Sequence, residues 1–212
     1  MKYEKLIQGV GDVLKEKYSS EEVKTILKEA QERCEALFEE NKEDSKALRE
    51  HTFKRVYPGI AMYETLTGHD ISSDDAVWYI REYFQRYCAR VMPYMRKLIA
   101  LPGVAKRFPK FFHNFSMKSF SVEAGFEYEF PDTTGNESRF SVIKCPYMEA
   151  CKRYGCTEIV KAFCDSDDAS YGDLHRDLHW GRTKTIGHEG DCCDFLLQYV
   201  KRQGEYDTVS DE

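Results

Sequence analysis

The 212-residue chain lacks the features that mark several large protein classes. No apolar run approaches the roughly 20 residues that a membrane-spanning helix needs. The N-terminal segment MKYEKLIQGVGDVLKEKY is charged throughout and has no signal-peptide apolar core. The net charge is −6, and the basic stretch of Lys106, Arg107 and Lys110 is too short for a phosphate-binding stripe. We therefore expect a cytoplasmic protein that binds neither membranes nor nucleic acid.

The cysteines also lack the spacing of a structural zinc site. Six of the eight fall in the last third of the chain, yet none form the Cys-x2-Cys knuckle. His175 and His179 would face one metal ion if they lay on a helix, but Gly172 and Gly181 leave little room for one. We expect reduced thiols, most of them small core residues, and no metal or other cofactor. Zinc or another divalent cation is the alternative.

Polar starts and apolar periodicity predict helices through the first hundred residues. Ser19 and Glu22 form a capping-box pattern before apolar residues that recur every three or four positions. Ser72 opens a long helix with a wide apolar stripe, whose tyrosines at 79–87 we expect in the core. Asp44 begins another predicted helix, which Pro58 kinks or breaks.

The periodicity then changes to that of strands. Alternation over 120–130 and 140–144 predicts an antiparallel hairpin around a turn at 132–136. Short helices at 146–154 and 157–163 come next, followed by strands at 180–186 and 193–199. We predict a single α+β domain over 1–212, with a helical N-terminal half packed on a small, mostly antiparallel sheet with short helices. Its parts are helical 1–103, a sheet-containing part 104–203 that carries the site, and an acidic tail 204–212.

The candidate chemistry lies between Cys145 and Phe195, where thiols, carboxylates and one arginine alternate with glycines. Cys164 is a candidate nucleophile, with His175 or His179 as base, although neighbouring carboxylates would raise the pKa of its thiol. Carboxylates are the second candidates, because one would activate water while another pairs with a cationic group. The four considered are expected at turns and strand ends, where turn stabilisation is the alternative role: Asp165, Asp167, Asp191 and Asp194.

Arg182 is the candidate for binding a carboxylate, since its planar guanidinium suits a bidentate contact. A salt bridge to a nearby aspartate is the alternative. In a strand, Thr183 and Thr185 would alternate with Arg182 and Lys184, so one of these pairs faces the pocket. The remaining histidines are expected at the surface or as satisfied core residues: His51, His69 and His113.

The order and spacing of these residues resemble the L-2-amino-thiazoline-4-carboxylic acid hydrolase family. The motifs that carry the resemblance are Cys145-Pro146-Tyr147, Cys164-Asp165-x-Asp167, Arg182-Thr183-x-Thr185 and Gly190-Asp191-x-Cys193-Asp194-Phe195, with Tyr57-Pro58-Gly59-Ile60-Ala61 in the helical half. The resemblance implies hydrolytic opening of a thiazoline ring that carries an exocyclic amine and a carboxylate, giving a carbamoyl-cysteine.

For that reaction, Asp165 or Asp167 would pair with the amidine-like ring carbon and Arg182 would hold the substrate carboxylate. Water activated by Asp194 or a histidine would attack the ring carbon, or Cys164 would attack it first. The predicted catalytic residues are Cys164, Asp165, Asp167 and Asp194, and the predicted substrate-binding residues are Arg182, Thr183, Thr185, Asp191 and Cys193.

A function of a different class is a non-catalytic, sensory domain that binds a small molecule, because the Cys-Asp-Phe ending is also similar to vinyl-reductase-type domains. In both cases the expected partner is a small molecule, with a carboxylate in the hydrolase case. The aromatic helices also fit a homodimer. The hydrolase hypothesis requires two clusters, Cys164–Asp167 and Arg182–Asp194, to meet.

Overall fold

The computed structural model describes residues 4–131 and 135–201 of the chain. Its first part is helical, as the periodicity predicts. The elements are α1 Glu4–Leu14, α2 Ser20–Glu40, α3 Lys46–His51, a π-helix Thr52–Val56, α4 Tyr57–Gly68, α5 Ser73–Ile99 and α6 Val104–Ser119. Helix α6 is not among the predicted helices, since residues from 104 onward are expected in the sheet-containing part.

At the predicted helix starts, polar side chains form the capping hydrogen bonds that the sequence indicates. The hydroxyl of Ser19 accepts from the backbone N–H of Glu22, whose carboxylate accepts from the N–H of Ser19, so the capping box is confirmed. Ser72 caps α5 in the same way through the N–H of Asp75. The start predicted at Asp44 lies one residue later, since the hydroxyl of Ser45 accepts from the N–H of Leu48.

A four-stranded antiparallel sheet follows, with strand order β1-β2-β4-β3. The strands are β1 Glu127–Glu129, β2 Glu137–Lys144, β3 Leu178–Gly181 and β4 Cys193–Tyr199. Central strands β2 and β4 pair Phe140 with Phe195 and Val142 with Cys193. These residues alternate with half-exposed ones, so one face of the sheet belongs to the core.

Two strand predictions require correction. The hairpin is shorter than the expected 120–145, because a 3-10 turn at Val122–Ala124 follows α6 and β1 spans only Glu127–Glu129. Residues 132–134 of its turn lie outside the described residues, as does the acidic tail 204–212. The strand expected over 180–186 ends at Gly181, and residues 182–185 run as a loop into a 3-10 turn, Ile186–His188.

The other elements of the last third are helices. Pro146 begins α7 Pro146–Arg153, and Gly155 follows it with a left-handed φ of 68°, as expected for a C-terminal cap. A 3-10 turn, Thr157–Ile159, then leads into α8 Val160–Tyr171, which is longer than the predicted 157–163. Asp165 and Asp167 therefore lie on a helix and not at a turn.

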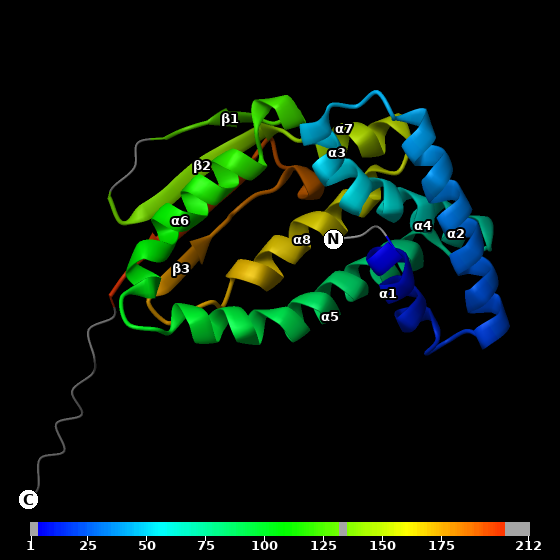
Figure 1. Ribbon diagram of the computed structural model, residues 1–212, viewed down its shortest axis with the longest axis horizontal. Helices are drawn as coiled ribbons and strands as arrows, with labels where there is room; N and C mark the ends of the chain where they lie inside the picture. The colour runs from blue at the N-terminus through cyan, green and yellow to red at the C-terminus, as the bar shows by residue number, and fades with distance from the viewer. Residues whose placement is uncertain (1–3, 132–134, 202–212) are drawn as a thin grey trace, which may run out of the picture.

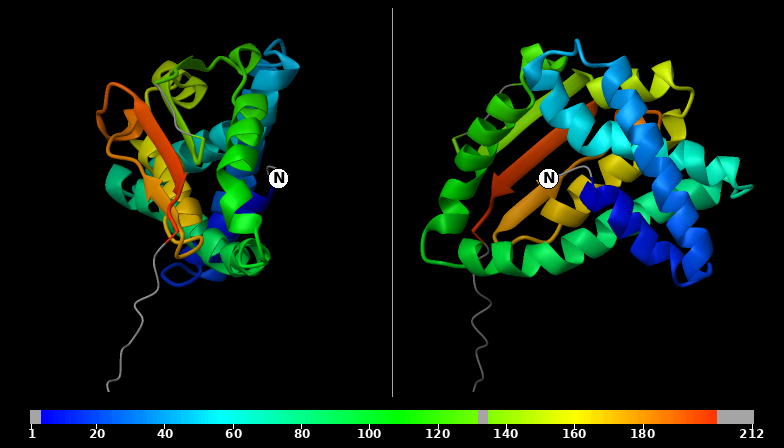
Figure 2. Two further views of the ribbon diagram at one scale, coloured as in Figure 1. Left: turned by 90° about the vertical axis from the view of Figure 1, so that its left-hand side faces the viewer. Right: turned by 45° about the vertical axis from the view of Figure 1, so that its right-hand side comes forward.

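The helices lie over one face of the sheet. Helix α6 packs on β2 and β4, and α5 packs along α8 (Figure 1). In the left view of Figure 2, β4 forms one flank of the molecule while α6 and α2 lie on the other. One connected hydrophobic core extends from Leu6 in α1 to Leu197 in β4 and includes Tyr79 and Tyr83, as predicted. The helical half is thus packed on the sheet, and the α+β prediction is confirmed.

The π-helix before α4 has a local cause. Pro58 has no N–H to give to the Lys54 carbonyl one turn earlier. The N–H of Tyr57 bonds to the Thr52 carbonyl, five residues back, which widens the turn. Pro58 thus distorts the helical run at its junction, as expected, without ending it. The segment 57–61, which carries one motif of the family resemblance, forms the buried first turn of α4.

Within the described ranges 4–131 and 135–201, no helix has both the length and the apolar character needed to cross a membrane.

Candidate functional site

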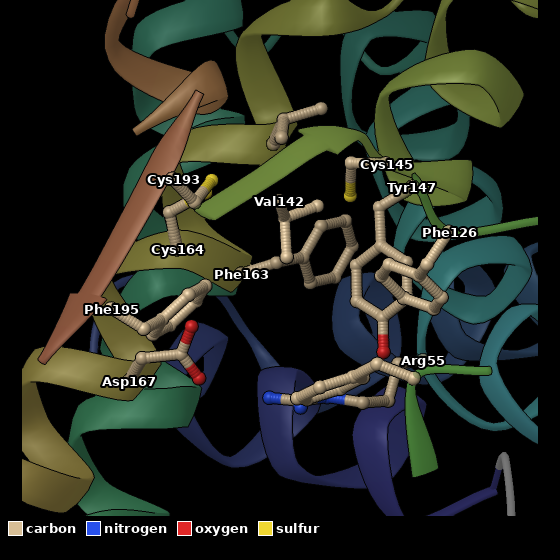
Figure 3. Close-up of a pocket in the computed structure, with 12 residues that line it drawn as sticks. Arg55, Phe126, Val142, Cys145, Tyr147, Phe163, Cys164, Asp167, Cys193 and Phe195 are labelled. Atoms are coloured by element: carbon tan, nitrogen blue, oxygen red, sulfur yellow. The ribbon is translucent and has the colours of Figure 1, made fainter. Parts of the chain in front are cut away.

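A cavity opens between the core face of the sheet, helix α8 and the start of α7. Its volume is about 60 Å³, which gives room for several waters at about 10–15 Å³ each. Residues from both halves of the chain surround it (Figure 3). The lining consists of Arg55, Phe120, Phe126, Val142, Cys145, Tyr147, Val160, Phe163, Cys164, Asp167, Cys193 and Phe195.

Two predicted site residues enter this cavity from α8. Cys164 and Asp167 are three positions apart, so the helix places them on one face, and both line the cavity. Figure 3 shows the two side chains directed into it. Cys193, also a predicted residue, reaches the same cavity from the start of β4. The two clusters that the hydrolase hypothesis requires to meet are therefore joined by Cys193 at the cavity and by the ion pair of Arg182 with Asp167.

The Cys164 thiol lies among hydrogen-bond donors that favour its ionised form. Its pKa is lowered, first by a hydrogen bond from the Cys193 thiol, with further support from the Thr185 hydroxyl and the Gly187 N–H, against burial and the charge of Asp167. Gly187 must be small, since a Cβ there would lie 2.8 Å from the Cys164 sulfur. Thiolate character is what a nucleophilic cysteine requires.

The two other thiols of the cavity are shifted in the opposite direction. Cys145 precedes the first residue of α7, and burial raises the pKa of its thiol to about 12. The pKa of Cys193 is also raised, chiefly because its thiol is the partner of Cys164. Of the three, only Cys164 has its pKa lowered.

Asp167 is held between the cavity and a buried arginine. Arg182 Nη1 lies 3.3 Å from Asp167 Oδ2, and the side chains are 2% and 28% exposed, respectively. Burial raises the pKa of Asp167 to about 6, although the charges of Arg182 and Arg55 act against the rise. A carboxyl with a pKa in this range exchanges a proton readily near neutral pH.

Arg182 itself does not line the cavity. Besides Asp167, its Nη2 donates to the Cys164 carbonyl at 2.8 Å and forms an ion pair with Asp168. Its guanidinium packs over the rings of Trp180 and Phe195. Arg182 thus makes the salt bridges that were the alternative to ligand binding, and it holds α8 against the sheet.

The other predicted catalytic carboxylates point elsewhere. Asp165 lies on a different face of α8, where its oxygens meet Arg81 Nε at 2.8 Å and His188 Nε2 at 2.7 Å. Asp194 accepts from the backbone N–H groups of Thr183 and Lys184 at 2.9 and 2.8 Å and so shapes the loop after β3. Neither carboxylate lines the cavity.

The remaining predicted binding residues divide in the same way. Thr183 is exposed, and its hydroxyl donates to the Asp194 carboxylate. Asp191 is also exposed, and its Oδ1 lies 2.7 Å from Lys184 Nζ. Thr185 is buried and sits next to Cys164. Because the strand ends at Gly181, the expected alternation does not decide which side chains turn inward.

The histidines considered as bases also lie outside the cavity lining. His175 accepts from the N–H of Asp177 at 3.1 Å in the turn before β3, and His179 is exposed on that strand. They share no helix, so the paired-ligand arrangement does not form. Among residues 4–131 and 135–201 there is no group of three or more His, Cys, Asp or Glu side chains that could hold a metal ion.

Arg55 is the cavity residue that sequence reasoning missed. It projects from the π-helix, its Nη2 donates to Ser166 Oγ at 2.8 Å, and its guanidinium lies 5.0 Å from the centre of the Phe84 ring. Its Nε is buried without a hydrogen-bond partner among the described residues. The basic residue two positions before the Tyr57 motif was the available signal, but nothing in its neighbourhood indicated burial.

Tyr147 lies beside Arg55 and is oriented by His51. His51 Nε2 must donate to the Ser119 carbonyl at 2.6 Å, so its Nδ1 accepts from the Tyr147 hydroxyl at 3.2 Å. Burial lowers the pKa of His51, which keeps the ring neutral. His51 is therefore a satisfied core histidine, as expected, and it directs the lone pairs of the Tyr147 oxygen away from itself.

A family model described as L-2-amino-thiazoline-4-carboxylic acid hydrolase matches residues 49–197, a range that contains every residue of the cavity lining. No curated protein matches the chain. Solved structures that match include Fe(II) unliganded H-NOX protein from K. algicida, with 12% identity and a TM-score of 0.35 over 95% of this chain and 98% of that one. A mutant of it matches with 11% identity and a TM-score of 0.34 over 95% and 97% of the two chains. Likenesses at these scores carry no functional argument.

Proposed function

The chain belongs to the L-2-amino-thiazoline-4-carboxylic acid hydrolase family, and we propose that it hydrolyses a small cyclic amidine, L-2-amino-thiazoline-4-carboxylic acid or a close relative, to a carbamoyl-cysteine. The observation that supports this reaction is the pairing of Cys164 and Asp167 on one face of α8, both at the same cavity. The pair supplies a nucleophile and an acid–base group within reach of one small molecule.

The substrate chemistry matches these two groups. The ring carbon between two nitrogens and a sulfur is electrophilic when the amidine is protonated. The ionised Asp167 stabilises that cation, while the Cys164 thiolate, favoured by its donors, attacks the carbon. Arg182 and Thr185 act indirectly. Arg182 holds Asp167 in place through an ion pair, and Thr185 holds Cys164 in place through a hydrogen bond.

The proposed covalent route balances without a redox step. A bond forms between Cys164 Sγ and the ring carbon, and the ring C–S or C–N bond breaks as the departing atom takes a proton. Water then adds to the same carbon, the Cys164–carbon bond breaks, and the thiolate is regenerated. Breaking the C–S bond gives N-carbamoyl-cysteine with a free thiol, whereas breaking the C–N bond gives S-carbamoyl-cysteine with a free amine.

The test is to incubate the purified protein with the thiazoline acid and follow substrate and product by mass spectrometry. Titration of free thiol in the product identifies which bond breaks. Turnover supports the proposal, whereas saturable binding without turnover contradicts it and favours a ligand-binding domain.

Two variants then test the mechanism. Cys164→Ser should lose turnover, since a serine hydroxyl is far weaker than a thiolate. Cys192→Ser is the matched control, because Cys192 is half-buried, adjacent to Cys193 in sequence, and absent from the cavity lining. Full activity in Cys164→Ser would exclude the covalent route in favour of water attacking directly.

A further inference from the structure

Arg55 is a cationic side chain that forms no ion pair within 4.0 Å among the described residues, although the charge of Asp167 acts on it. The three acids of α8 form their ion pairs with other arginines, Asp165 with Arg81 and both Asp167 and Asp168 with Arg182. A buried or half-buried guanidinium normally has a carboxylate or a full set of hydrogen bonds, because its charge is costly to remove from water. The Arg55 guanidinium has neither an ion pair nor a hydrogen bond from Nε among the described residues. This indicates that an anion binds to it in the cavity.

The surroundings of Arg55 fix its guanidinium in one place. Ser166 Oγ accepts from its Nη2, Phe84 lies under its plane, and Tyr147 stands beside it. The π-helix that carries it results from Pro58, so the side chain is positioned by the backbone as well as by packing. Such pre-organisation reduces the entropy lost when a ligand binds.

A negative charge lies near Arg55 in the same cavity. Figure 3 shows the Asp167 carboxylate and the Arg55 guanidinium directed toward one another. They form no ion pair within 4.0 Å, and Asp167 is paired with Arg182 instead. A cavity that carries a cation and a carboxylate among apolar rings is complementary to a small zwitterion.

We infer that Arg55, rather than Arg182, binds the carboxylate of the substrate and selects for rings that carry one. This inference rests on the proposed function for the identity of the substrate. Asp167 faces the amidinium end of the same molecule, so Arg55 and Asp167 orient the ring carbon toward Cys164. Arg55 is then a specificity-determining residue contributed by the helical half of the chain.

The test compares two substrates, the thiazoline acid and 2-amino-2-thiazoline, which is the same ring without the carboxylate. The wild-type protein should prefer the acid in kcat/KM. In Arg55→Gln this preference should fall by about 10- to 100-fold, the range expected for a lost charge-assisted hydrogen bond, mainly through a higher KM. Arg55→Lys should lie between the two, since it keeps the charge and loses the bidentate fork.

Lys54→Gln is the matched control. It removes one positive charge from the adjacent position of the same π-helix, where the side chain is 41% exposed and paired with Glu50. Its substrate preference should equal that of the wild type. An unchanged preference in folded Arg55→Gln, or no preference for the acid in the wild type, would overturn the inference while leaving the hydrolase intact.

Binding measured by calorimetry distinguishes failure of the inference from failure of the proposed function. If the wild type hydrolyses neither ring, the proposed function fails, and binding of the thiazoline acid and its carboxamide is measured instead. Tighter binding of the acid that disappears in Arg55→Gln supports the role of Arg55; equal binding of both compounds contradicts it. If circular dichroism shows that Arg55→Gln is unfolded, Arg55→Lys takes its place in both arms.

Discussion

Two arginines, one from each half of the chain, contact helix α8 but differ in the partners that they have there. Arg182 comes from the loop after β3, is 2% exposed, and pairs with two aspartates and a backbone carbonyl. Arg55 comes from the π-helix, donates to a neutral serine, and lines the cavity. The one inside a recognisable motif is engaged by the protein itself, whereas the one outside it retains unused hydrogen-bonding capacity.

The comparison teaches that residue type and motif do not distinguish a cation paired within the protein from one that lines the cavity without an ion pair. What separates them is the number of acidic partners within reach, which depends on the packing of distant elements. Four experiments would break or sharpen this comparison.

Removing Arg182 should have the largest effect. Arg182→Gln is expected to lower the free energy of unfolding by about 3–5 kcal/mol, because it removes a buried guanidinium and leaves the half-buried Asp167 without its ion pair. Denaturant titration followed by circular dichroism measures this. Arg176→Gln, at a position 81% exposed, is the control and should change stability by less than about 0.5 kcal/mol. Equal small effects in both variants would contradict the structural role of Arg182.

Neutralising Asp167 should come next. The pKa of Asp167 is raised to about 6, so its carboxylate is protonated as the pH falls through that value, and kcat/KM should drop by about tenfold per pH unit below it. Asp167→Asn should lose activity by about 10²–10³-fold and lose this acidic limb. The control is Asp168→Asn, which also contacts Arg182 but is 53% exposed. A pH profile of Asp167→Asn that keeps the acidic limb would assign it to another group.

The contact between the two halves can be tested with paired glycines of α4. A Cβ at Gly59 would lie 2.7 Å from Phe163 Cζ, whereas Gly68 has open space. Gly59→Ala should destabilise the fold by about 1–3 kcal/mol through overpacking. Gly68→Ala should stabilise it slightly, because alanine favours the helix. Thermal unfolding distinguishes the two variants. If Gly59→Ala left the stability unchanged, the Phe163 ring would have to shift without destabilising the fold.

Selective alkylation should show the smallest difference. At pH 7, iodoacetamide should label Cys164 faster than Cys145 by at least about tenfold, since thiolate character controls the rate. The cause is that donors lower the pKa of Cys164 while burial raises that of Cys145. Peptide mass spectrometry over time measures both rates. Faster labelling of Cys145 would contradict the arrangement of donors around Cys164.

The sequence predicted those features of the fold that depend on residues close to one another along the chain. The capping box at Ser19, the cap at Ser72 and the left-handed Gly155 are short-range hydrogen-bond or backbone effects. The predictions failed where tertiary contacts override local propensity. The aromatic alternation from residue 120 gave only a short β1, because Phe120 and Phe126 turn inward to line the cavity.

The site was predictable only in part. The residue types were visible in the sequence, but the predicted helix ended at residue 163, and only its continuation as α8 to Tyr171 brings Cys164 and Asp167 onto one face. The loop after Gly181 was not predictable, since Asp194 shapes it through backbone hydrogen bonds that a strand pattern does not reveal. His51 and Tyr147 are 96 positions apart, and no local signal joins them.

The sequence by itself determined the family, the α+β class, and the segment of the chain in which the proposed nucleophile and acid lie. Only the tertiary structure decided which of the many acids and cations face the cavity. Charge and chemistry are properties of single residues and can be read in order along the chain. Whether a charge is already neutralised depends on partners far away in sequence, and this distinguishes Arg182, which is paired with acids of α8, from Arg55, which lines the cavity without an ion pair.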